Sequence, residues 1–532
     1  TTSSSHSWMP PALPSWNGCV SPTPSPLINI FPSMDLLFLI PDIISSYMAK
    51  FYITTAIPYV NAKPHIGHAL EFIQSDVIAR YHKIIGDDVL FLCGGDENAI
   101  KNVQAAEKEN IPIQEFVDKN SQLFADLAKK LKVHFDVFKK GSDKIHHLSS
   151  QKLWNLCLAN GDIYKKSYTG LYCVGCELFY QKEELDRNGQ CFEHPGRKLE
   201  KVSETNYFFR LSKHEKDLKR IINDKHDSQH IEIIPEKRRH EVQSFLELGL
   251  KDISISRSNE RAKNWGVPVP NDKTQRMYVW FDALNIYQSG VGFGLDEEKY
   301  EKWWPADLHV IGKGILRFHA IYWPAFLLSA RLKLPRKLFV HEYVTVNGQK
   351  MSKTVGNVLD PIPLIEKYGT DALRYYLLAK ISPFADGDFS EEKFKETYNA
   401  DLANGLGNLV ARVAKLCETT QYHQMESSNK EYGHLISIEE YSDALNKFRF
   451  NDALGLVWKK IAELDRFIND EKPWELLKTN DHRIKAILSH AVDQIQEIAI
   501  LLEPFMPETA KKIENQFKGP KITSQKPLFP RI

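Results

Sequence analysis

The stretch that most constrains the fold is FYITTAIPYVNAKPHIGHALEFIQSDVIA, residues 51–79. Its first part, Phe51 to Ile57, is aromatic and β-branched and is closed by Pro58, which predicts a buried strand. The next residues are polar and turn-prone, and from His68 onward apolar residues recur at helical spacing. This order of strand, loop and helix predicts a strand that feeds a phosphate-binding turn.

The junction between loop and helix carries His65, Gly67 and His68. Two imidazoles three residues apart would project from one side of the first helical turn, and Gly67 lets a ligand approach the backbone. Unpaired N–H groups and the helix dipole favour phosphate at such an end, and two histidine donors would add directed hydrogen bonds to a phosphoryl centre. A structural pair or a stray metal pair is the alternative, so a second, distant match is needed.

Lys350 and Lys353 supply that match in the loop KMSKT, residues 350–354, after a strand predicted from Phe339 to Val346. Two lysines three residues apart in a loop can bring mobile positive charge to a polyphosphate. The alternative is a solvated loop with no ligand.

Together the two stretches resemble the HIGH and KMSKS signatures of class I aminoacyl-tRNA synthetases, and the pairing is far more specific than either member. Three further stretches are similar to the methionyl-tRNA synthetase family in particular: ITTAIPYVNAKPHIGH, MYVWFDALNIY and HVIGKGILRFHAIYWPAFL. The resemblance runs from about Met48 to the region of Trp474 and is loose beyond it. It implies a methionine–tRNA ligase with ATP as substrate, Mg²⁺ beside the nucleotide, and methionine and tRNA(Met) as partners.

The resemblance also assigns roles at the nucleotide. It implies catalytic roles for His65, His68, Lys350 and Lys353. The same four side chains, together with Gly67 and Lys313, are expected to contact ATP.

A second buried strand is predicted from Asp88 to Cys93, followed by Gly94-Gly95-Asp96-Glu97-Asn98. Carboxylates at the end of a strand in an α/β unit lie where ligands bind, although Asp96 could simply be a cap. The resemblance places Asp96 at the amino group of methionine. The usual family pattern is Gly-Thr-Asp-Glu-His, from which Gly95 and Asn98 depart.

A third strand is predicted from Met277 to Phe281, and it is followed by more aromatic residues. Trp280 and Tyr287 could be plain core aromatics, but the resemblance places both in a pocket for a thioether, whose sulfur favours aromatic edges. The positions that the resemblance implies for methionine are Ala56, Ile57, Tyr59, Asp96, Trp280, Leu284, Tyr287 and His319.

Sulfur and imidazole ligands occur in two pairs, Cys173 with Cys176 and, after fourteen residues, Cys191 with His194. Two such knuckles can close a tetrahedral zinc site, so we predict structural Zn²⁺. The alternative is a pair of packed turns that has lost its metal. The family's insertion between the halves of its nucleotide fold often carries such knuckles.

We predict the following organisation. Residues 1–47, rich in Ser, Pro and Thr, are expected to be disordered or a non-native extension, because Met48 would be a natural start. A doubly wound, Rossmann-like parallel sheet is expected in two halves, 48–165 and 241–345, split by a zinc-knuckle insertion at 166–240, with a connector at 346–390 and an α-helical bundle at 391–532.

The bundle carries three polar or aromatic residues that suit an unpaired loop of RNA. Asn408 and Arg412 lie four apart, hence on one helix face, and Trp474 follows Pro473 at a helix start. Asn and Arg can bind base edges and Trp can stack a base. The resemblance implies that these three residues read the anticodon; without it they would be ordinary surface residues. Some members of the family append a further dimerising domain; we expect none here and therefore a monomer.

The composition limits the class of protein and the number of domains. With 42% hydrophobic and 26% charged residues among 532, the chain is typical of a large globular protein with three or four domains. A net charge of +1 gives no support to nucleic-acid binding, which must then rest on a local basic face. The 7 thinly spread cysteines indicate a reduced, cytoplasmic protein. No long apolar run predicts a membrane span.

Three alternatives stay open. Another class I synthetase for an apolar amino acid would keep both signatures. A small nucleotidyltransferase also uses a His-x-x-His turn but would not need the helical domain. A paralogue that only binds tRNA would not need His65, His68 and Lys353.

Overall fold

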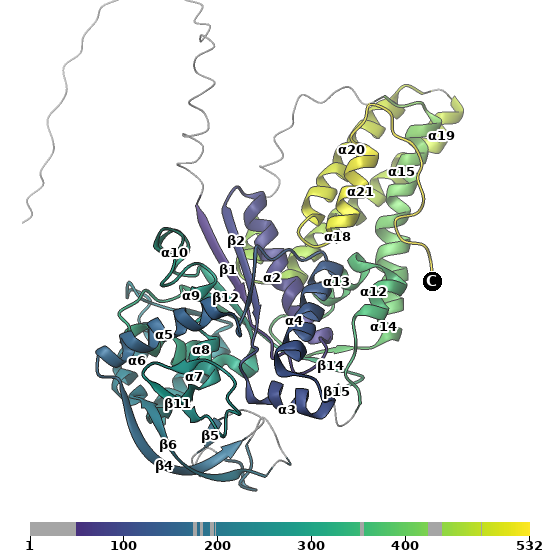
Figure 1. The fold of residues 1–532 in the computed structure, drawn as a ribbon. Coiled ribbons are helices and arrows are strands. Elements are labelled where there is room, and N and C mark those ends of the chain that lie inside the picture. The colour runs from purple at the N-terminus through teal and green to yellow at the C-terminus, as the bar shows by residue number, and fades with distance from the viewer. Residues whose placement is uncertain are drawn as a thin grey trace, which may run out of the picture. The chain divides into compact units, whose positions relative to one another are not determined.

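The computed structural model describes residues 49–173, 178–180, 185–191, 196, 198–351, 356–423, 439–479 and 481–532 (Figure 1). The extension predicted at 1–47 lies outside these residues. So do three of the predicted site residues, Cys176, His194 and Lys353.

Six parallel strands form the central sheet, in the spatial order β3-β2-β1-β12-β13-β7. Their bounds are β1 (Lys50–Thr55), β2 (Asp88–Gly95), β3 (Val137–Lys140), β7 (Glu232–Ile234), β12 (Leu308–Gly312) and β13 (Lys337–His341). The chain moves outward from β1 to β3 and later returns to the other side of β1, so the order reverses between β1 and β12. In open parallel sheets ligands bind beside the carboxyl ends of the strands at such a reversal. The predicted doubly wound sheet is confirmed.

Helices cover both faces of this sheet, which explains its continuous apolar strands. On β1, Ile53 faces one core and its neighbour Tyr52 faces the other, because successive side chains point to opposite faces. The first core includes α2 (Ile66–Ile84) and α4 (Ile113–Lys130), and the second includes α5 (Lys144–Ala159) and α11 (Trp323–Ser329). Helix α3 (Ile100–Glu109) packs on α4.

Between the two halves of the sheet the chain builds a β-rich lobe. A four-stranded antiparallel sheet has the order β5-β4-β6-β8, and its long strands β4 and β6 are visible in Figure 1. The bounds are β4 (Ile163–Cys173), β5 (Leu178–Tyr180), β6 (Glu200–Phe209), β8 (Ile253–Ser254), β9 (Ser256–Ser258), β10 (Pro268–Val269) and β11 (Asp272–Met277), with helices η3 (Leu211–His214), α6 (Glu215–Asn223) and α7 (Glu236–Glu247). Strand β7, from within residues 166–240, pairs with β13 in the central sheet.

The strand predicted from Met277 to Phe281 is wrong. Strand β11 ends at Met277, and helix α8 begins at Val279 and runs to Ala283. A short apolar run that is buried on all sides has no alternation, so its pattern does not separate helix from strand. Helices α9 (Ile286–Ser289) and α10 (Glu297–Trp303), the short turn η4 (Lys313–Ile315) and the π-helical segment η5 (Phe318–Tyr322) follow along the chain.

The strand predicted from Phe339 to Val346 is two strands. Strand β13 ends at His341 in the central sheet, whereas β14 (Val344–Val346) pairs with β15 (Gln349–Lys350) and β16 (Gly387–Phe389) in a separate sheet. The break occurs where the chain leaves the carboxyl end of β13.

The C-terminal part is helical, as predicted, and α15, α18, α20 and α21 lie side by side in Figure 1. The bounds are α12 (Ile362–Tyr368), α13 (Thr370–Ala379), α14 (Glu391–Thr397), the π-helical η6 (Tyr398–Gly407), α15 (Asn408–Thr419), α17 (Glu439–Asn446), α18 (Phe450–Glu471), α19 (Pro473–Thr479), α20 (Arg483–Leu502) and α21 (Pro507–Phe517). None of the described helices has the length and apolar character needed to cross a bilayer.

A buried arginine joins the helical part to the first helix of the sheet. Arg374 on α13 donates to the carbonyl oxygens of Phe505 (2.7 Å) and Pro504 (2.8 Å) beyond α20 and pairs with Asp76 of α2 at 2.7 Å. Because its guanidinium has no exposed surface, these acceptors replace water, and the two parts are fixed to each other by several polar contacts.

Candidate functional site

A cavity of about 500 Å³ opens at the carboxyl ends of β1 and β12, where the strand order reverses. It collects residues that are far apart in the sequence. The predicted residues that line it are Ala56, Ile57, Tyr59, His65, Gly67, His68, Trp280, Leu284, Tyr287, His319 and Lys350. The nucleotide signature and the aromatic pocket therefore share one cavity.

The first turn of α2 is built around the two histidines. His65 is the N-cap residue, and its Nδ1 accepts from the backbone N–H of Gly67 at 3.1 Å, while Nδ1 of His68 accepts from the N–H of His65 at 3.1 Å. The rings stack with centroids 3.8 Å apart. A Cβ at Gly67 would lie only 3.0 Å from the His65 ring, so the glycine is required for this arrangement. The helix begins two residues earlier than His68 because the histidines cap it.

These caps also fix which nitrogen carries the proton. An Nδ1 that accepts a hydrogen bond must be unprotonated, so each neutral ring carries its proton on Nε2 and can donate there. Burial, together with the neighbouring His65 and His341, lowers the pKa of His68 well below its usual value. His68 is therefore a neutral donor at physiological pH.

The second signature lies against the first. Lys350, the last residue of β15, lines the cavity, and a Cβ at Gly67 would lie 3.7 Å from Cε of Met351. Further along, the carbonyl of Leu359 accepts from the N–H of Ile66, the first residue of α2, at 2.9 Å. The described residues of the second stretch, Lys350 and Met351, thus line the same cavity as the two histidines.

Aromatic rings form the apolar end of the cavity. The Trp280 ring stacks on Phe318 with centroids 3.6 Å apart and meets the Tyr59 ring edge-on at 6.0 Å. Trp280 is only 6% exposed and lines the cavity. Such a lining accommodates a flexible, polarizable side chain.

Tyr287 and His319 place one polar contact in this apolar end. His319 Nδ1 donates to the carbonyl of Ile315 at 3.0 Å, so Nε2 is the acceptor for the Tyr287 hydroxyl at 2.8 Å. Burial lowers the pKa of His319 to about 4, so the ring is neutral near pH 7. Burial also raises the pKa of Tyr287 well above its usual value.

Two predicted contact residues do not line the cavity. Asp96 is 3% exposed and follows the end of β2, where it forms an isolated bridge with Tyr59. Lys313 lies just beyond β12, between the lining residues Gly312 and Gly314. Both are therefore adjacent to the cavity wall.

The departures from the family pattern near Asp96 have local explanations. A Cβ at Gly95 would lie 2.8 Å from Oγ of Ser121, so this packing requires glycine. Asn98 is buried and donates to Asp282 at 2.7 Å and to the carbonyl of Gly141 at 2.8 Å.

Sequence reasoning missed a proton-sharing pair in the cavity, Glu71 and His341. His341 Nδ1 donates to the carbonyl of Glu342 at 2.8 Å, and Nε2 lies 2.9 Å from Glu71 Oε2. Because a carboxylate only accepts, one proton must sit between ring and carboxyl. Thr55 donates to the other oxygen of Glu71. Two features of the sequence could have indicated this pair: Glu71 lies one helical turn after His68, and His341 lies at the end of a predicted strand.

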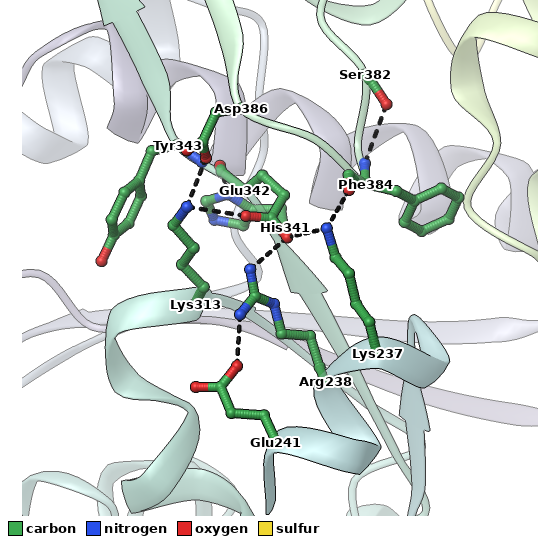
Figure 2. Close-up of polar contacts among 10 residues, drawn as sticks. All are labelled: Lys237, Arg238, Glu241, Lys313, His341, Glu342, Tyr343, Ser382, Phe384 and Asp386. Carbon is green, nitrogen blue, oxygen red and sulfur yellow. Dashed lines mark hydrogen bonds and ion pairs between the residues drawn. The ribbon is translucent and has the colours of Figure 1, made fainter. Parts of the chain in front are cut away.

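Glu342, also missed, is the centre of the ion-pair network in Figure 2. Its carboxylate, 3% exposed, contacts Lys237 at 2.6 Å, Lys313 at 3.0 Å and Arg238. Lys313 pairs in addition with Asp386 at 2.6 Å. Although burial opposes ionisation, hydrogen bonds from Arg238, Lys237 and Lys313 hold the pKa of Glu342 at about 2.

The two described members of the predicted zinc set lie together. Sγ of Cys173 is 3.6 Å from Sγ of Cys191, and both residues are buried. This separation is too long for a disulfide, which needs about 2.05 Å. Two thiolates on one tetrahedral zinc, each with a Zn–S distance of about 2.3 Å, would be nearly 3.8 Å apart.

The bundle brings two of its three predicted residues together. The Arg412 guanidinium lies 5.9 Å from the Trp474 ring and is held by Asp465 and Asn469, each at 3.0 Å. Trp474 is 39% exposed, which is unusual for so large an apolar ring. Asn408 begins α15 and is also exposed.

Comparisons with known proteins agree with this geometry. The family model described as tRNA synthetases class I (M) matches residues 51–414, and that described as anticodon binding domain of methionyl tRNA ligase matches residues 422–526. The chain is 41% identical to a methionine–tRNA ligase of Thermotoga maritima over 87% of this chain and 74% of the relative. It is 39% identical to that of Brucella suis, over 91% and 98%.

A solved structure is similar over nearly the whole described chain. It is Mycobacterium tuberculosis methionyl-tRNA synthetase in complex with methionyl-adenylate, with a TM-score of 0.84 and 36% identity over 91% of this chain and 100% of that one. Taken with the two signatures in one cavity and the family models that cover both parts of the molecule, this shows that the chain belongs to the methionyl-tRNA synthetases of class I.

Proposed function

We propose that the enzyme activates methionine with ATP and transfers it to tRNA(Met). In the first step a methionine carboxylate oxygen attacks the α-phosphorus of ATP, pyrophosphate leaves, and methionyl-adenylate forms. In the second step a hydroxyl of the terminal ribose of tRNA attacks the adenylate carbonyl, and AMP leaves. The related Mycobacterium tuberculosis enzyme has been solved with methionyl-adenylate, which supports the first step.

The observation that carries this proposal is the shared cavity, in which a phosphate-binding helix end meets an aromatic pocket. The phosphate of methionyl-adenylate suits the helix end, and its methionine side chain suits the aromatic pocket. His65 and His68 would donate from Nε2 to the reacting phosphate, and Lys350 and Lys353 would bring positive charge to the leaving pyrophosphate. No protein side chain becomes covalently attached, since positioning and charge stabilisation suffice.

The apolar end would hold the thioether of methionine between Trp280, Leu284 and Tyr287. We assign Asp96 to the methionine ammonium group, as the resemblance implies, and Lys313 to the nucleotide. Magnesium would arrive with ATP, since it is usually bound through phosphates with few protein ligands, and it would neutralise phosphate charge.

We further propose that Cys173, Cys176, Cys191 and His194 hold one structural Zn²⁺. The close approach of the Cys173 and Cys191 thiols supports it, because those two sulfurs lie at nearly the separation that a shared zinc requires. Metal analysis of purified protein should give about one zinc per chain, and Cys173→Ser should reduce it. Zinc-free protein from zinc-replete medium would contradict this assignment.

For tRNA selection we propose that Asn408, Arg412 and Trp474 bind anticodon bases, since an exposed ring beside a guanidinium suits unstacked bases. The scattered cysteines support a reducing compartment, and we propose that the enzyme acts in the cytoplasm.

Pyrophosphate exchange tests the proposal. Each amino acid is supplied in turn with ATP and labelled pyrophosphate, and methionine alone should support rapid exchange. Exchange with leucine, isoleucine or valine instead would favour another class I synthetase, and tRNA binding without any exchange would favour a non-catalytic paralogue.

A further inference from the structure

One aromatic ring at the cavity, that of Tyr343, carries two of the lysines assigned to ATP. The ammonium of Lys313 lies 4.5 Å from the ring centroid, and that of Lys350 lies 5.4 Å from it. Tyr343 and Lys350 both line the cavity. The two lysines come from different parts of the chain, one directly after β12 and the other at the end of β15. The ring therefore brings together two cations that the fold supplies separately.

The Tyr343 ring has little room to move. The backbone N–H of Tyr343 donates to Oδ1 of Asp386 at 2.9 Å, and its carbonyl accepts from the N–H of Gly387 at 3.0 Å. A Cβ at Gly314 would overlap the Tyr343 hydroxyl oxygen, although it would lie 3.5 Å from the ring carbon Cζ. The hydroxyl thus lies directly against the glycine, and a side chain at this position would displace the ring.

Two carboxylates hold Lys313 beside the ring. Its ammonium lies 2.6 Å from Asp386 and 3.0 Å from Glu342, as Figure 2 shows. Although burial opposes the charge, hydrogen bonds to Asp386 and Glu342 raise the pKa of Lys313, which is therefore a cation at physiological pH. Oδ1 of Asp386 accepts from both Lys313 and the N–H of Tyr343, so one carboxylate positions the lysine and the ring together.

Lys313 can leave these carboxylates for a phosphate at small cost. Glu342, 3% exposed, would keep Lys237 and Arg238 as partners and so would not become an unpaired buried charge. The Asp386 side chain is 48% exposed, so water can replace the lysine there. Lys350, the other cation on the ring, is exposed. Both ammonium groups are therefore accessible to an anion that enters the cavity beside Tyr343.

We propose that Tyr343 is a positioning residue for ATP, whose ring holds Lys313 and Lys350 where their ammonium groups bind the two phosphates that leave as pyrophosphate. The inference rests on the proposed function, since it concerns the polyphosphate of the ATP assigned to this cavity. A ring attracts a cation without neutralising it, so both lysines keep their charge for the phosphates. Cations held at fixed positions stabilise the charge that develops on the leaving group.

The first test compares Tyr343→Leu, which removes the ring, with Tyr343→Phe, which keeps it. In methionine-dependent pyrophosphate exchange, Tyr343→Leu should raise the KM for ATP about fivefold to thirtyfold, as expected for the loss of two partly exposed cation–ring contacts. The KM for methionine should not change, and Tyr343→Phe should behave as the parent. Tyr164→Leu is the matched control, because its ring carries Arg210 at 4.4 Å but does not line the cavity.

The second test displaces the ring without removing it. Gly314→Ala places a Cβ against the Tyr343 hydroxyl and should raise the KM for ATP. Tyr343→Phe in the same chain removes the overlap and leaves Cζ at an ordinary contact distance, so the double variant should regain the parental KM. A Cβ that obstructed ATP itself would not be relieved by the loss of this hydroxyl.

Adenosine, which has no phosphate, separates positioning of the lysines from a general loss of packing. Adenosine should inhibit exchange as strongly in Tyr343→Leu as in the parent. A parental KM for ATP in Tyr343→Leu, or a weakening of adenosine as large as that of ATP, would overturn the proposal. So would a Gly314→Ala enzyme that Tyr343→Phe fails to restore. Absence of methionine-dependent exchange in the parental enzyme would instead overturn the proposed function.

Discussion

The Tyr287 hydroxyl donates to Nε2 of His319 over 2.8 Å, and both side chains are buried. This bond fixes a neutral histidine in the apolar end of the cavity, since Nδ1 already donates to the Ile315 carbonyl. Because both nitrogens of this neutral ring are already hydrogen-bonded, the ring keeps that end of the cavity apolar. It also makes the protein sensitive to acid.

The acid sensitivity can be measured. The pKa of His319 is about 4 in the fold against 6.5 for an ordinary histidine, so between these values the unfolded chain binds more protons and the free energy of unfolding rises with pH. Stability should therefore fall as pH drops from about 6.5 to about 4, by about 3 kcal/mol for this group. Urea unfolding at a series of pH values should show a flatter dependence in His319→Asn than in the parent. Replacement of the exposed His134 by Asn is the control, and an equal slope in both variants would refute the assignment.

Replacing His68 by Ala removes a neutral Nε2 donor directed at the reacting phosphate. Adenylate formation should fall roughly 100- to 1,000-fold, the usual loss for one such donor, with little change in methionine affinity. Pyrophosphate exchange gives the rate, and His134→Ala, at an exposed position, serves as control. Parental exchange by His68→Ala would show that the ring is only a helix cap.

Glu342→Gln removes the carboxylate that Lys237, Arg238 and Lys313 share, as Figure 2 shows. Three cations then face one another without their common partner, and the free energy of unfolding should fall by about 1 to 3 kcal/mol. Glu241→Gln, which removes a half-exposed partner of Arg238 alone, should cost well under 1 kcal/mol, about the worth of a surface pair. Chemical denaturation of both variants measures the loss in free energy of unfolding. Equal losses would show that Glu342 stabilises the fold no more than a surface ion pair does.

Trp474→Ala should weaken methionylation of tRNA about tenfold to a hundredfold, the value of one stacked base, while exchange stays intact. The ring lies on α19, far along the chain from the cavity residues, and is 39% exposed. Arg412→Ala should behave alike and should also blunt discrimination against altered anticodons; Arg483→Ala, on the exposed start of α20, is its control. Equal losses of exchange and methionylation would indicate that Trp474 only stabilises the bundle.

Sequence patterns correctly predicted the strands and helices in which one hydrophobic periodicity runs through the whole segment. The strand and helix around His65 and the helical C-terminal part lie close to their predicted positions because one period runs through each. Residues 277–281 were predicted wrongly because a short, wholly buried apolar run fits a strand and a helix equally well.

The residues that line the cavity likewise fall into a predicted group and an unpredicted group. Side chains within the signature stretches, such as His65, Trp280 and Lys350, were predicted, and they line it. Glu71, His341 and Glu342 were not, because each is placed by a contact with a partner distant in sequence, as His341 is by Glu71. Sequence spacing carries no information on such pairs until the sheet order brings the strand ends together.

The most direct test is to charge an unfractionated tRNA pool with each of the twenty amino acids in turn and to sequence the tRNA that becomes acylated. The proposed function predicts that methionine alone is attached, and only to tRNAs with the CAU anticodon. Attachment of another amino acid, or of methionine without regard to the anticodon, would contradict it.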